Sequence, residues 1–342
     1  MEHVKEQIIT DNYAVYNADC MEVITQLPNE SVDLSVYSPP FAGLYNYSSD
    51  DRDFSNCESK EQFMAQYEYL VKEMARVTKK GRINAVHCQD ILTHTTNHIL
   101  YDFPHEIIEL HKKYGFTYNN RITIWKEPLE VRMRTMVQSL MHKNIVEDST
   151  MCFTAIPDYL LIFKKTGENA VKVTHENGFE HYFGNTPLTA AMEEKYGKWS
   201  HILEKYKSHK DPKTNKKAHI IWQRYASSVW DDIDNKNVLP FRDAREDDDE
   251  KHVHPLQLDV IDRLVELYSN EGEVVLTPFM GVGSEVYSPV SMGRKAIGVE
   301  LKDSYFKQAK INLMHAKTRF ESDATFEQVS LLDSVSEEEL AA

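Results

Sequence analysis

EVVLTPFMGVGSE, residues 273–285, is the most informative segment of this 342-residue chain. Its apolar, β-branched start predicts a strand, and the strand runs into a turn that contains Gly281 and Gly283. Glycine lets the backbone approach a bound ligand closely, and a helix is expected after the turn. This order of strand, glycine turn and helix is typical of a ligand-binding unit in an α/β fold.

A second strand ending in a carboxylate follows about twenty residues later. AIGVE, residues 296–300, ends at Glu300, and an acid at this place binds ribose hydroxyls in nucleotide-binding folds. The turn before it lacks the lysine of a phosphate-binding loop. The two segments therefore favour an adenosine without phosphates over ATP or NAD as the ligand.

The rest of the chain alternates short β-branched or aromatic runs with longer amphipathic stretches, which predicts an α/β fold with a mostly parallel sheet. Seven strands are expected, at Tyr13–Tyr16, Val32–Tyr37, Ile83–His87, Arg121–Trp125, Tyr159–Phe163, Val274–Leu276 and Ala296–Val299. Helices are expected at Lys60–Thr78, Leu256–Tyr268 and Asp303–His315. We expect Lys79, Lys80 and Gly81 to end the first helix with a basic turn and a glycine stop.

DLSVYSPPF, residues 33–41, is an apolar strand that stops abruptly at two prolines. Strand ends are where ligands bind in open parallel sheets, and the prolines stiffen the backbone and leave nearby carbonyls without competing amide donors. The Ser38 hydroxyl, the carbonyls of Ser38 and Pro39, and the Phe41 ring suit a planar ring that carries an NH₂ group. Taken alone, the motif is more often a strand that ends at proline beside a buried phenylalanine.

Composition limits the classes of function. The net charge of −15 excludes a protein that coats nucleic acid through bulk electrostatics, so any DNA contact must be local. The chain shows no apolar run long enough to span a bilayer and no signal-peptide layout at its start, so we expect a cytoplasmic protein that does not bind membranes. The four cysteines form no C-x-x-C pair, and the fifteen histidines show no ligand spacing, so we expect reduced thiols and no metal.

Residues 167–250 fit the sheet pattern poorly and predict an inserted region. The segment contains a basic stretch that is interleaved with aromatic residues, including Trp199, Tyr206, Trp222 and Tyr225. Such a stretch suits phosphate and base contacts, although a solvated loop and helix face would look the same. The expected DNA-binding residues are Lys213, Lys216, Lys217 and Arg224.

At this point the chain resembles a known family, the amino-group DNA methyltransferases that depend on S-adenosylmethionine. Their permuted order of motifs, with the catalytic motif before the cofactor motif, is called the β class. The segments that carry the resemblance are NADCMEVITQLP at 17–28, SPPF at 38–41, TPFMGVG at 277–283 and IGVE at 297–300. Four ordered motifs are far more specific than any one of them.

The resemblance implies a Rossmann-like methyltransferase fold with a circularly permuted motif order. It divides the chain into a catalytic half at 1–166, a target-recognition region at 167–250, a cofactor half at 251–318 and an acidic tail at 319–342. It also implies that Ser38, Pro39, Pro40 and Phe41 hold a base flipped out of double-stranded DNA. The cofactor residues that it implies are Asp19, Thr277, Pro278, Phe279, Gly281, Gly283 and Glu300.

One position departs from the family, which usually has aspartate where this chain has Thr277. A neutral hydroxyl can accept a hydrogen bond from the cofactor ammonium, but a charge-assisted bond is about twice as strong. An inactive DNA-binding module on the same fold is therefore an alternative to a methyltransferase that releases S-adenosylhomocysteine.

The sequence also leaves open which amino group is methylated. Serine before the double proline leans slightly toward cytosine N4 rather than adenine N6, and RNA or a protein amide would offer a similar NH₂ group. The sequence leaves open whether the protein forms a homodimer and whether a cognate restriction endonuclease accompanies it.

Overall fold

The computed structural model describes residues 4–40, 57, 59–94, 99–135, 140–176, 178–184, 193–195, 197–198, 214–244, 255–314 and 316. Within them, one nine-stranded sheet has the order β1-β2-β11-β10-β3-β4-β8-β7-β9. Its strands are β1 (Glu6–Ile9), β2 (Tyr13–Asn17), β3 (Val32–Tyr37), β4 (Thr78–Cys88), β7 (Phe116–Ile124), β8 (Asp158–Lys165), β9 (Val229–Trp230), β10 (Val274–Thr277) and β11 (Lys295–Glu300). All seven predicted strands lie in this sheet, and β1 and β9 extend it at its two edges.

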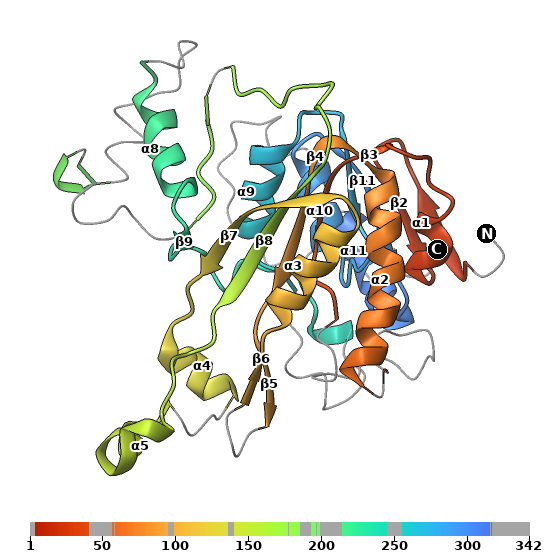
Figure 1. Ribbon diagram of the computed structural model, residues 1–342. Helices are drawn as coiled ribbons and strands as arrows, with labels where there is room; N and C mark the ends of the chain where they lie inside the picture. The colour runs from red at the N-terminus through yellow and green to blue at the C-terminus, as the bar shows by residue number, and fades with distance from the viewer. Residues whose placement is uncertain are drawn as a thin grey trace, which may run out of the picture.

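Five neighbouring strands, β2, β11, β10, β3 and β4, run parallel, whereas β8 is antiparallel to both β4 and β7. Helices cover both faces, as Figure 1 shows. On one face lie α1 (Cys20–Ile24), α2 (Lys60–Val77) and α3 (Phe103–Lys113), and on the other lie α9 (Leu258–Tyr268), α10 (Ser284–Ser291) and α11 (Asp303–Met314). β3 is buried along its whole length, and the centre of β8 is the buried apolar run Leu160–Phe163, as expected for strands covered on both faces.

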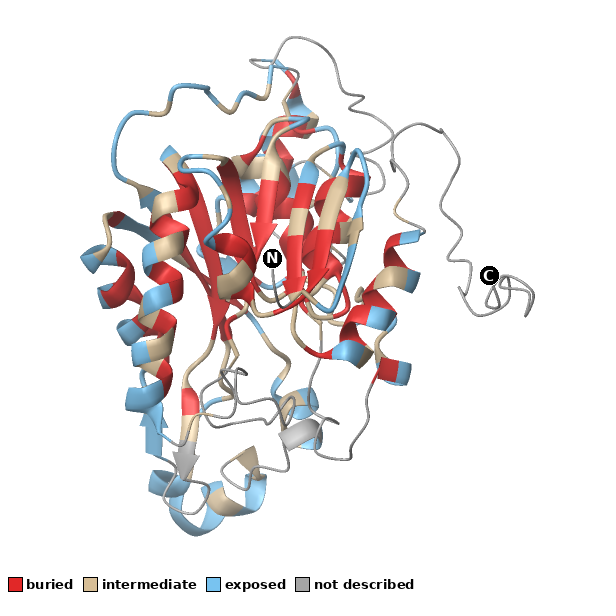
Figure 2. Cartoon of the chain, turned by 90° about the vertical axis from the view of Figure 1, so that its right-hand side faces the viewer, coloured by how far each residue is buried: buried red, intermediate tan, exposed pale blue. Residues whose placement is uncertain are grey.

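The core follows from side-chain alternation along the strands. On β8, Leu161 and Phe163 pack with α2 and α3, whereas Leu160 and Ile162 pack with α9. Figure 2 shows this buried sheet at the centre of the molecule. Packing between α10 and the sheet is close at Gly298 on β11, where an added Cβ would lie 2.5 Å from Val286 Cγ2. Only glycine therefore lets α10 approach the sheet this closely.

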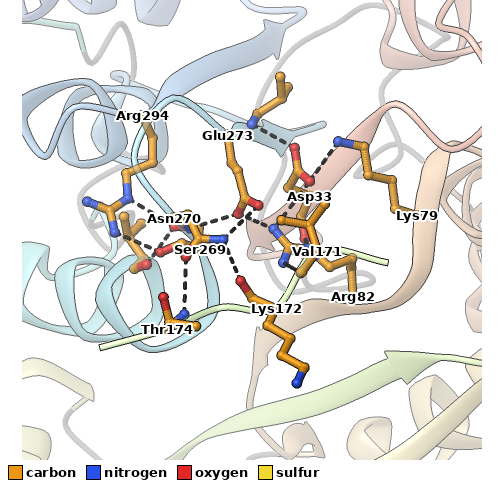
Figure 3. Close-up of polar contacts among 12 residues, drawn as sticks. Asp33, Lys79, Arg82, Val171, Lys172, Thr174, Ser269, Asn270, Glu273 and Arg294 are labelled. Carbon is orange, nitrogen blue, oxygen red and sulfur yellow. Dashed lines mark hydrogen bonds and ion pairs between the residues drawn. The ribbon is translucent and has the colours of Figure 1, made fainter. Parts of the chain in front are cut away.

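An ion-pair network fixes the register of three strands at their amino ends (Figure 3). Asp33 of β3 accepts hydrogen bonds from the Val274 amide at 3.0 Å and from Lys79 Nζ at 2.7 Å. The buried Arg82 of β4 contacts Asp33 Oδ1 at 3.2 Å and also pairs with Glu273. Since a buried charge is costly without a partner, this network holds β3, β4 and β10 in one arrangement.

The network also explains one wrong prediction. Lys79, Lys80 and Gly81 do not end the helix; α2 ends at Val77, and these residues begin β4. Gly81 adopts a φ of +72°, but it does so within the strand, where an added Cβ would meet the backbone of Asn169 at 2.5 Å. The glycine is therefore required for close backbone packing and not as a helix stop.

Three further helices, α4, α5 and α8, lie outside the two layers that cover the sheet. After β7, α4 (Pro128–Thr135) and α5 (His142–Asp148) extend from the sheet together with the hairpin of β5 (Ile91–His94) and β6 (Ile99–Tyr101), which follows β4 (Figure 1). Helix α8 (Lys216–Tyr225) lies toward the opposite end of the sheet. In the part of the chain that the structure describes, no helix is both long and apolar enough to cross a membrane.

Candidate active site

The carboxyl ends of the five parallel strands lie side by side along one edge of the sheet, with neighbouring strands about 4.8 Å apart. Polar residues stand at or next to each of these ends. In sheet order they are Asp19 after β2, Glu300 on β11, Thr277 on β10, Ser38 after β3 and His87 on β4. The fold thus brings together residues from both ends of the chain, at the edge where open α/β sheets bind ligands.

The turn after β10 is held to β11 by two backbone contacts. The Met280 amide donates to the Val299 carbonyl at 2.9 Å, and the Gly281 amide donates to Glu300 Oε2 at 2.9 Å. Gly281 has a φ of +52°, and an added Cβ there would have no described atom within 4 Å. The backbone at Gly281 therefore borders open space, as a ligand that approaches the main chain requires.

Gly283 has a different reason to be glycine. It precedes α10 with a φ of +97°, and an added Cβ would lie 3.3 Å from Ala309 Cβ of α11. This glycine therefore allows the left-handed turn and the contact between α10 and α11. Of the other residues of this segment, Pro278 is buried, and the half-buried Phe279 packs against Tyr37 with ring centroids 6.1 Å apart.

Three buried polar groups gather around this turn. Thr277 Oγ1 and Ser284 Oγ have no hydrogen-bond partner among the described residues. The Glu285 carboxyl, at the start of α10, is buried as well. Burial raises the pKa of Glu285 to about 8, and the nearby Glu300 adds to the rise. Since buried polar groups in native proteins almost always have partners, these groups are suited to a polar ligand.

Asp19 and Glu300 both stabilise local structure. Asp19 caps α1 by accepting a hydrogen bond from the Met21 amide at 2.9 Å. Glu300 Oε1 accepts one from the Lys302 amide at 2.8 Å. Any ligand contact of these carboxylates must use the acceptor capacity that remains, since each carboxylate can accept about four hydrogen bonds.

The catalytic motif predicted at residues 38–41 is described through Pro40, and Phe41 lies outside the described residues. Pro39 is buried, and Ser38 and Pro40 are half-buried at the end of β3. β3 pairs in parallel with β10 through Leu34 and Ser35. The Ser38 hydroxyl therefore lies one strand away from the glycine turn after β10.

Sequence reasoning missed the residues that hold Ser38. Ser38 Oγ lies 2.8 Å from Nδ1 of His87, and His87 Nε2 lies 3.2 Å from Asp158 Oδ2. Lys126 Nζ pairs with Asp158 Oδ1 at 2.5 Å. Burial by itself would raise the pKa of Asp158, but Lys126 and His87 outweigh it and hold that pKa below its ordinary value. The available signal was positional, because each of these residues lies at a strand end.

The predicted DNA-binding residues that the structure describes lie in two different environments. Lys213 lies outside the described residues, and Lys216 is exposed at the start of α8, with the half-buried Lys217 beside it. Arg224 corrects the prediction: it is 6% exposed, and its Nη2 pairs with Asp231 Oδ1 at 2.5 Å and Asp232 Oδ2 at 3.1 Å. Its guanidinium is thus used inside the protein and is not presented to a phosphate.

The predicted insertion is partly integrated into the fold. Trp230 of β9 is fully buried and extends the sheet beside β7. Arg263 of α9 is also fully buried, pairs with Asp232 at 2.9 Å, and lies 4.8 Å from the centroid of Tyr225. The segment therefore packs on the α9 face, while its boundaries as a recognition region stay a prediction.

Comparisons with known proteins agree with this arrangement. The model of the DNA methylase family (N6_N4_Mtase) matches residues 32–311. The Type II methyltransferase M.BglII of Bacillus subtilis is 23% identical over 293 residues, which cover 85% of this chain and 66% of that protein. M.BamHI of Bacillus amyloliquefaciens, also a Type II methyltransferase, is 25% identical over 301 residues, which cover 88% of this chain and 57% of that protein. The chain thus spans less than two thirds of the length of either relative.

Among solved structures, TTHA0409 of Thermus thermophilus, a candidate DNA modification methylase, superposes with a TM-score of 0.56 at 22% identity. The match covers 90% of this chain and 96% of that one. TTHA0409 has also been solved in complex with S-adenosyl-L-methionine. This likeness, together with the large mostly parallel sheet, confirms the predicted α/β fold class.

Proposed function

The chain belongs to the DNA methylase family, and on that premise we propose that it transfers a methyl group from S-adenosylmethionine to the exocyclic amino nitrogen of a base in double-stranded DNA. One observation carries this proposal. The Ser38-Pro39-Pro40 segment and the glycine turn after Thr277 leave neighbouring parallel strands at the same edge of the sheet. A base-binding group and a cofactor-binding turn are thereby within reach of one reaction centre.

The residues at the edge fit the proposed cofactor. Its ammonium and sulfonium groups are cationic, and the half-buried Glu300 supplies a carboxylate near the turn. The buried Glu285, whose pKa is raised to about 8, adds a carboxyl group that can form hydrogen bonds. The hydroxyls of Thr277 and Ser284, which have no hydrogen-bond partner among the described residues, are available for its polar groups. The open space over Gly281 leaves room for the ligand beside the main chain. These features support a cofactor pocket formed by the ends of β10 and β11 and the start of α10.

When bound, S-adenosylmethionine supplies an activated methyl group, so the protein needs mainly to orient the accepting nitrogen and exclude water. Ser38 Oγ and the Pro39 carbonyl accept hydrogen bonds from the NH₂ group. Pro40 has no amide hydrogen that would compete for these oxygens. Fixed acceptors of this kind favour the geometry in which the nitrogen lone pair leaves the plane of the ring, which stabilises the transition state.

The target amino group is stacked and paired in a duplex, so the base must be flipped out, at a cost of a few kcal/mol. Phe41 stacks on the flipped ring in this proposal. We assign cytosine N4 as the first target to test, because Ser38 occupies the position at which serine leans toward cytosine in the resembling family. Adenine N6 offers the same NH₂ chemistry and is the alternative.

DNA contacts are proposed at Lys213, Lys216 and Lys217, and the buried Arg224 is left out. Helix α8 lies toward the opposite end of the sheet from α4 and α5 (Figure 1). Phosphate contacts at α8 would position the duplex and carry no sequence information directly.

The alternative of an inactive DNA-binding module rests on Thr277, because the neutral hydroxyl replaces the carboxylate expected at this position. Cofactor binding separates the two functions. A methyltransferase binds S-adenosylmethionine and turns over, whereas an inactive module fails at one of these steps.

The proposal is tested by incubating the protein with labelled S-adenosylmethionine and either duplex DNA or RNA of matched sequence. Label in DNA alone supports the proposal. Label in RNA alone would mean that the substrate is RNA and not DNA. In the double variant Ser38→Ala with Phe41→Ala, transfer should be abolished while cofactor binding stays near that of the unmodified protein. Loss of cofactor binding in that variant would mean that the motif is structural.

A further inference from the structure

A chain of polar contacts leads from Ser38 away from the sheet edge and joins three strands. Ser38 follows β3, His87 lies on β4, and Asp158 begins β8. Consecutive polar atoms in the chain are 2.8 Å and 3.2 Å apart. His87 and Asp158 are 8% and 6% exposed, so water competes little for these contacts.

The contacts of Asp158 decide the tautomer of His87. A carboxylate only accepts hydrogen bonds, so the 3.2 Å contact with Asp158 Oδ2 favours the tautomer that carries its hydrogen on His87 Nε2. In the neutral imidazole, Nδ1 is then the acceptor, and the Ser38 hydroxyl donates to it. The lone pairs of Ser38 Oγ are thereby left to accept a hydrogen bond from an amino group.

Lys126 keeps Asp158 ionised. Its ammonium lies 2.5 Å from Asp158 Oδ1, on the carboxylate oxygen that does not face His87. Lys126 lies two residues after the end of β7. The series of contacts from Ser38 to Lys126 therefore depends on the positions of β3, β4, β8 and β7. The arrangement is a hydroxyl, an imidazole and a carboxylate in series, which is the order found where a serine hydroxyl must give up a proton.

We propose that His87, oriented by Asp158 and Lys126, positions the Ser38 hydroxyl and takes up the proton that leaves the methylated amino nitrogen. The inference rests on the proposed methyl transfer. His87 acts through Ser38, so it and Asp158 are positioning residues for the reaction.

Atoms and charge balance in this step. The amino nitrogen forms a bond to the methyl carbon as the bond between that carbon and the donor sulfur breaks, and the sulfur keeps the electron pair. The nitrogen then gives a proton to Ser38 Oγ, and the Ser38 hydroxyl proton passes to His87 Nδ1. The positive charge that was on the donor sulfonium ends on the imidazolium beside Asp158. Transfer to water later restores the neutral ring.

The groups around His87 bear on its pH response. Asp158 from β8 and Lys126 after β7 face the ring directly, and Ser38 faces it from β3. Asp90 and Arg121 are linked to the same region through Tyr159, which donates to Asp90 at 3.4 Å and lies under the Arg121 guanidinium at 4.9 Å. Protonation of His87 before the reaction would block its acceptor nitrogen, so the transfer rate should fall in acid.

The first test does not depend on activity. Nitrogen-15 NMR of the histidine rings should show Nδ1 of His87 unprotonated and Nε2 protonated at neutral pH. In Asp158→Asn this preference should be lost, whereas in His105→Gln, a change on the exposed face of α3, it should be unaltered. A hydrogen on Nδ1 of His87 in the unmodified protein would overturn the inference.

The second test measures single-turnover methyl transfer to duplex DNA against pH. In His87→Gln the rate should fall about 100-fold or more, with cofactor and DNA dissociation constants within about twofold, and the acid limb should disappear. His105→Gln should behave like the unmodified protein. A rate for His87→Gln within about threefold, with the same acid limb, would overturn the inference. Absence of any transfer by the unmodified protein would instead refute the proposed function.

Thermal denaturation controls for folding in each variant. If His87→Gln does not fold, Asp158→Asn and Lys126→Met are measured in its place, and both should lower the transfer rate without weakening cofactor binding. Unchanged rates in both of these variants would count against the inference in the same way.

Discussion

The Gly281 amide donates a hydrogen bond to Glu300 Oε2 at 2.9 Å, and this bond ties the turn after β10 to the end of β11. The other oxygen of Glu300 accepts from the Lys302 amide. One carboxylate therefore shapes the loop and also presents negative charge beside the open space over Gly281. In the proposed function, the same group binds the ribose of the cofactor.

Glu300→Ala should weaken S-adenosylmethionine binding about tenfold or more, because it removes both the acceptor and the bond to the turn. Glu300→Gln keeps an amide oxygen for Gly281 and should retain part of the affinity. Isothermal titration calorimetry measures both. Equal affinities in the two variants and the unmodified protein would exclude Glu300 from the cofactor site.

Thr277→Val should change stability and binding in opposite directions. The Thr277 hydroxyl is buried without a partner among the described residues, so removing it should stabilise the unliganded protein by about 1 kcal/mol. If the hydroxyl accepts a hydrogen bond from the cofactor, the same change should weaken cofactor binding severalfold. Thermal denaturation with and without S-adenosylmethionine gives both values. Unchanged affinity would assign the hydroxyl no part in binding.

Glu285 predicts a pH-dependent stability. Burial raises the pKa of its carboxyl from 4.5 to about 8, so the folded protein holds a proton there that the unfolded chain releases. Stability should therefore decrease as pH rises from about 4.5 to about 8, where both states become ionised. Glu285→Gln should show little effect near pH 4.5 and an increasing gain in melting temperature, of a few degrees, toward pH 8.

The control for this titration is Glu168→Gln, because Glu168 is exposed. The pKa of Glu266 is also raised to about 8 by burial, and its contribution is present in both proteins that are compared. A melting-temperature difference between Glu285→Gln and the unmodified protein that does not vary with pH would contradict the prediction.

Lys216→Gln with Lys217→Gln should weaken DNA binding and make its dependence on salt less steep. Each lost phosphate contact reduces the slope of log K against log salt by about 0.9. Lys72→Gln, on the exposed side of α2, is the matched control. Binding to a labelled duplex at several salt concentrations gives the slopes, and an unchanged slope would remove α8 from the interface.

Arg224→Gln provides a contrast in the same helix. Its guanidinium pairs with Asp231 and Asp232, so the change should lower the melting temperature rather than the salt slope. If Arg224→Gln instead made the dependence of DNA binding on salt less steep and left the melting temperature unchanged, Arg224 would be a DNA contact.

Much of the fold was predictable because the apolar pattern is local. The strand Val32–Tyr37 was predicted with its observed bounds, since it is buried on both faces and ends at proline. The strand β9 was missed because two residues carry no periodic signal. The strand β4 starts earlier than predicted because Lys79 and Arg82 are held by Asp33, a partner more than forty positions away.

Only the local parts of the candidate site could be predicted from the sequence. Ser38 and the glycine turn are short motifs that can be recognised in one stretch of sequence. His87 was not singled out from the fifteen histidines, because its contacts with Ser38 and Asp158 exist only once β3, β4 and β8 are adjacent. Arg224 was misassigned for the related reason that its charge is neutralised by Asp231 and Asp232, which the chain folds back onto it.

The most direct test is nucleoside mass spectrometry of unmethylated duplex DNA after incubation with the protein and labelled S-adenosylmethionine. We predict a labelled N4-methylcytosine peak, and a labelled N6-methyladenine peak would keep the methyltransferase while moving its target to adenine. The absence of any labelled nucleoside, from protein that is folded and binds DNA, would contradict the proposed function and favour the inactive DNA-binding module.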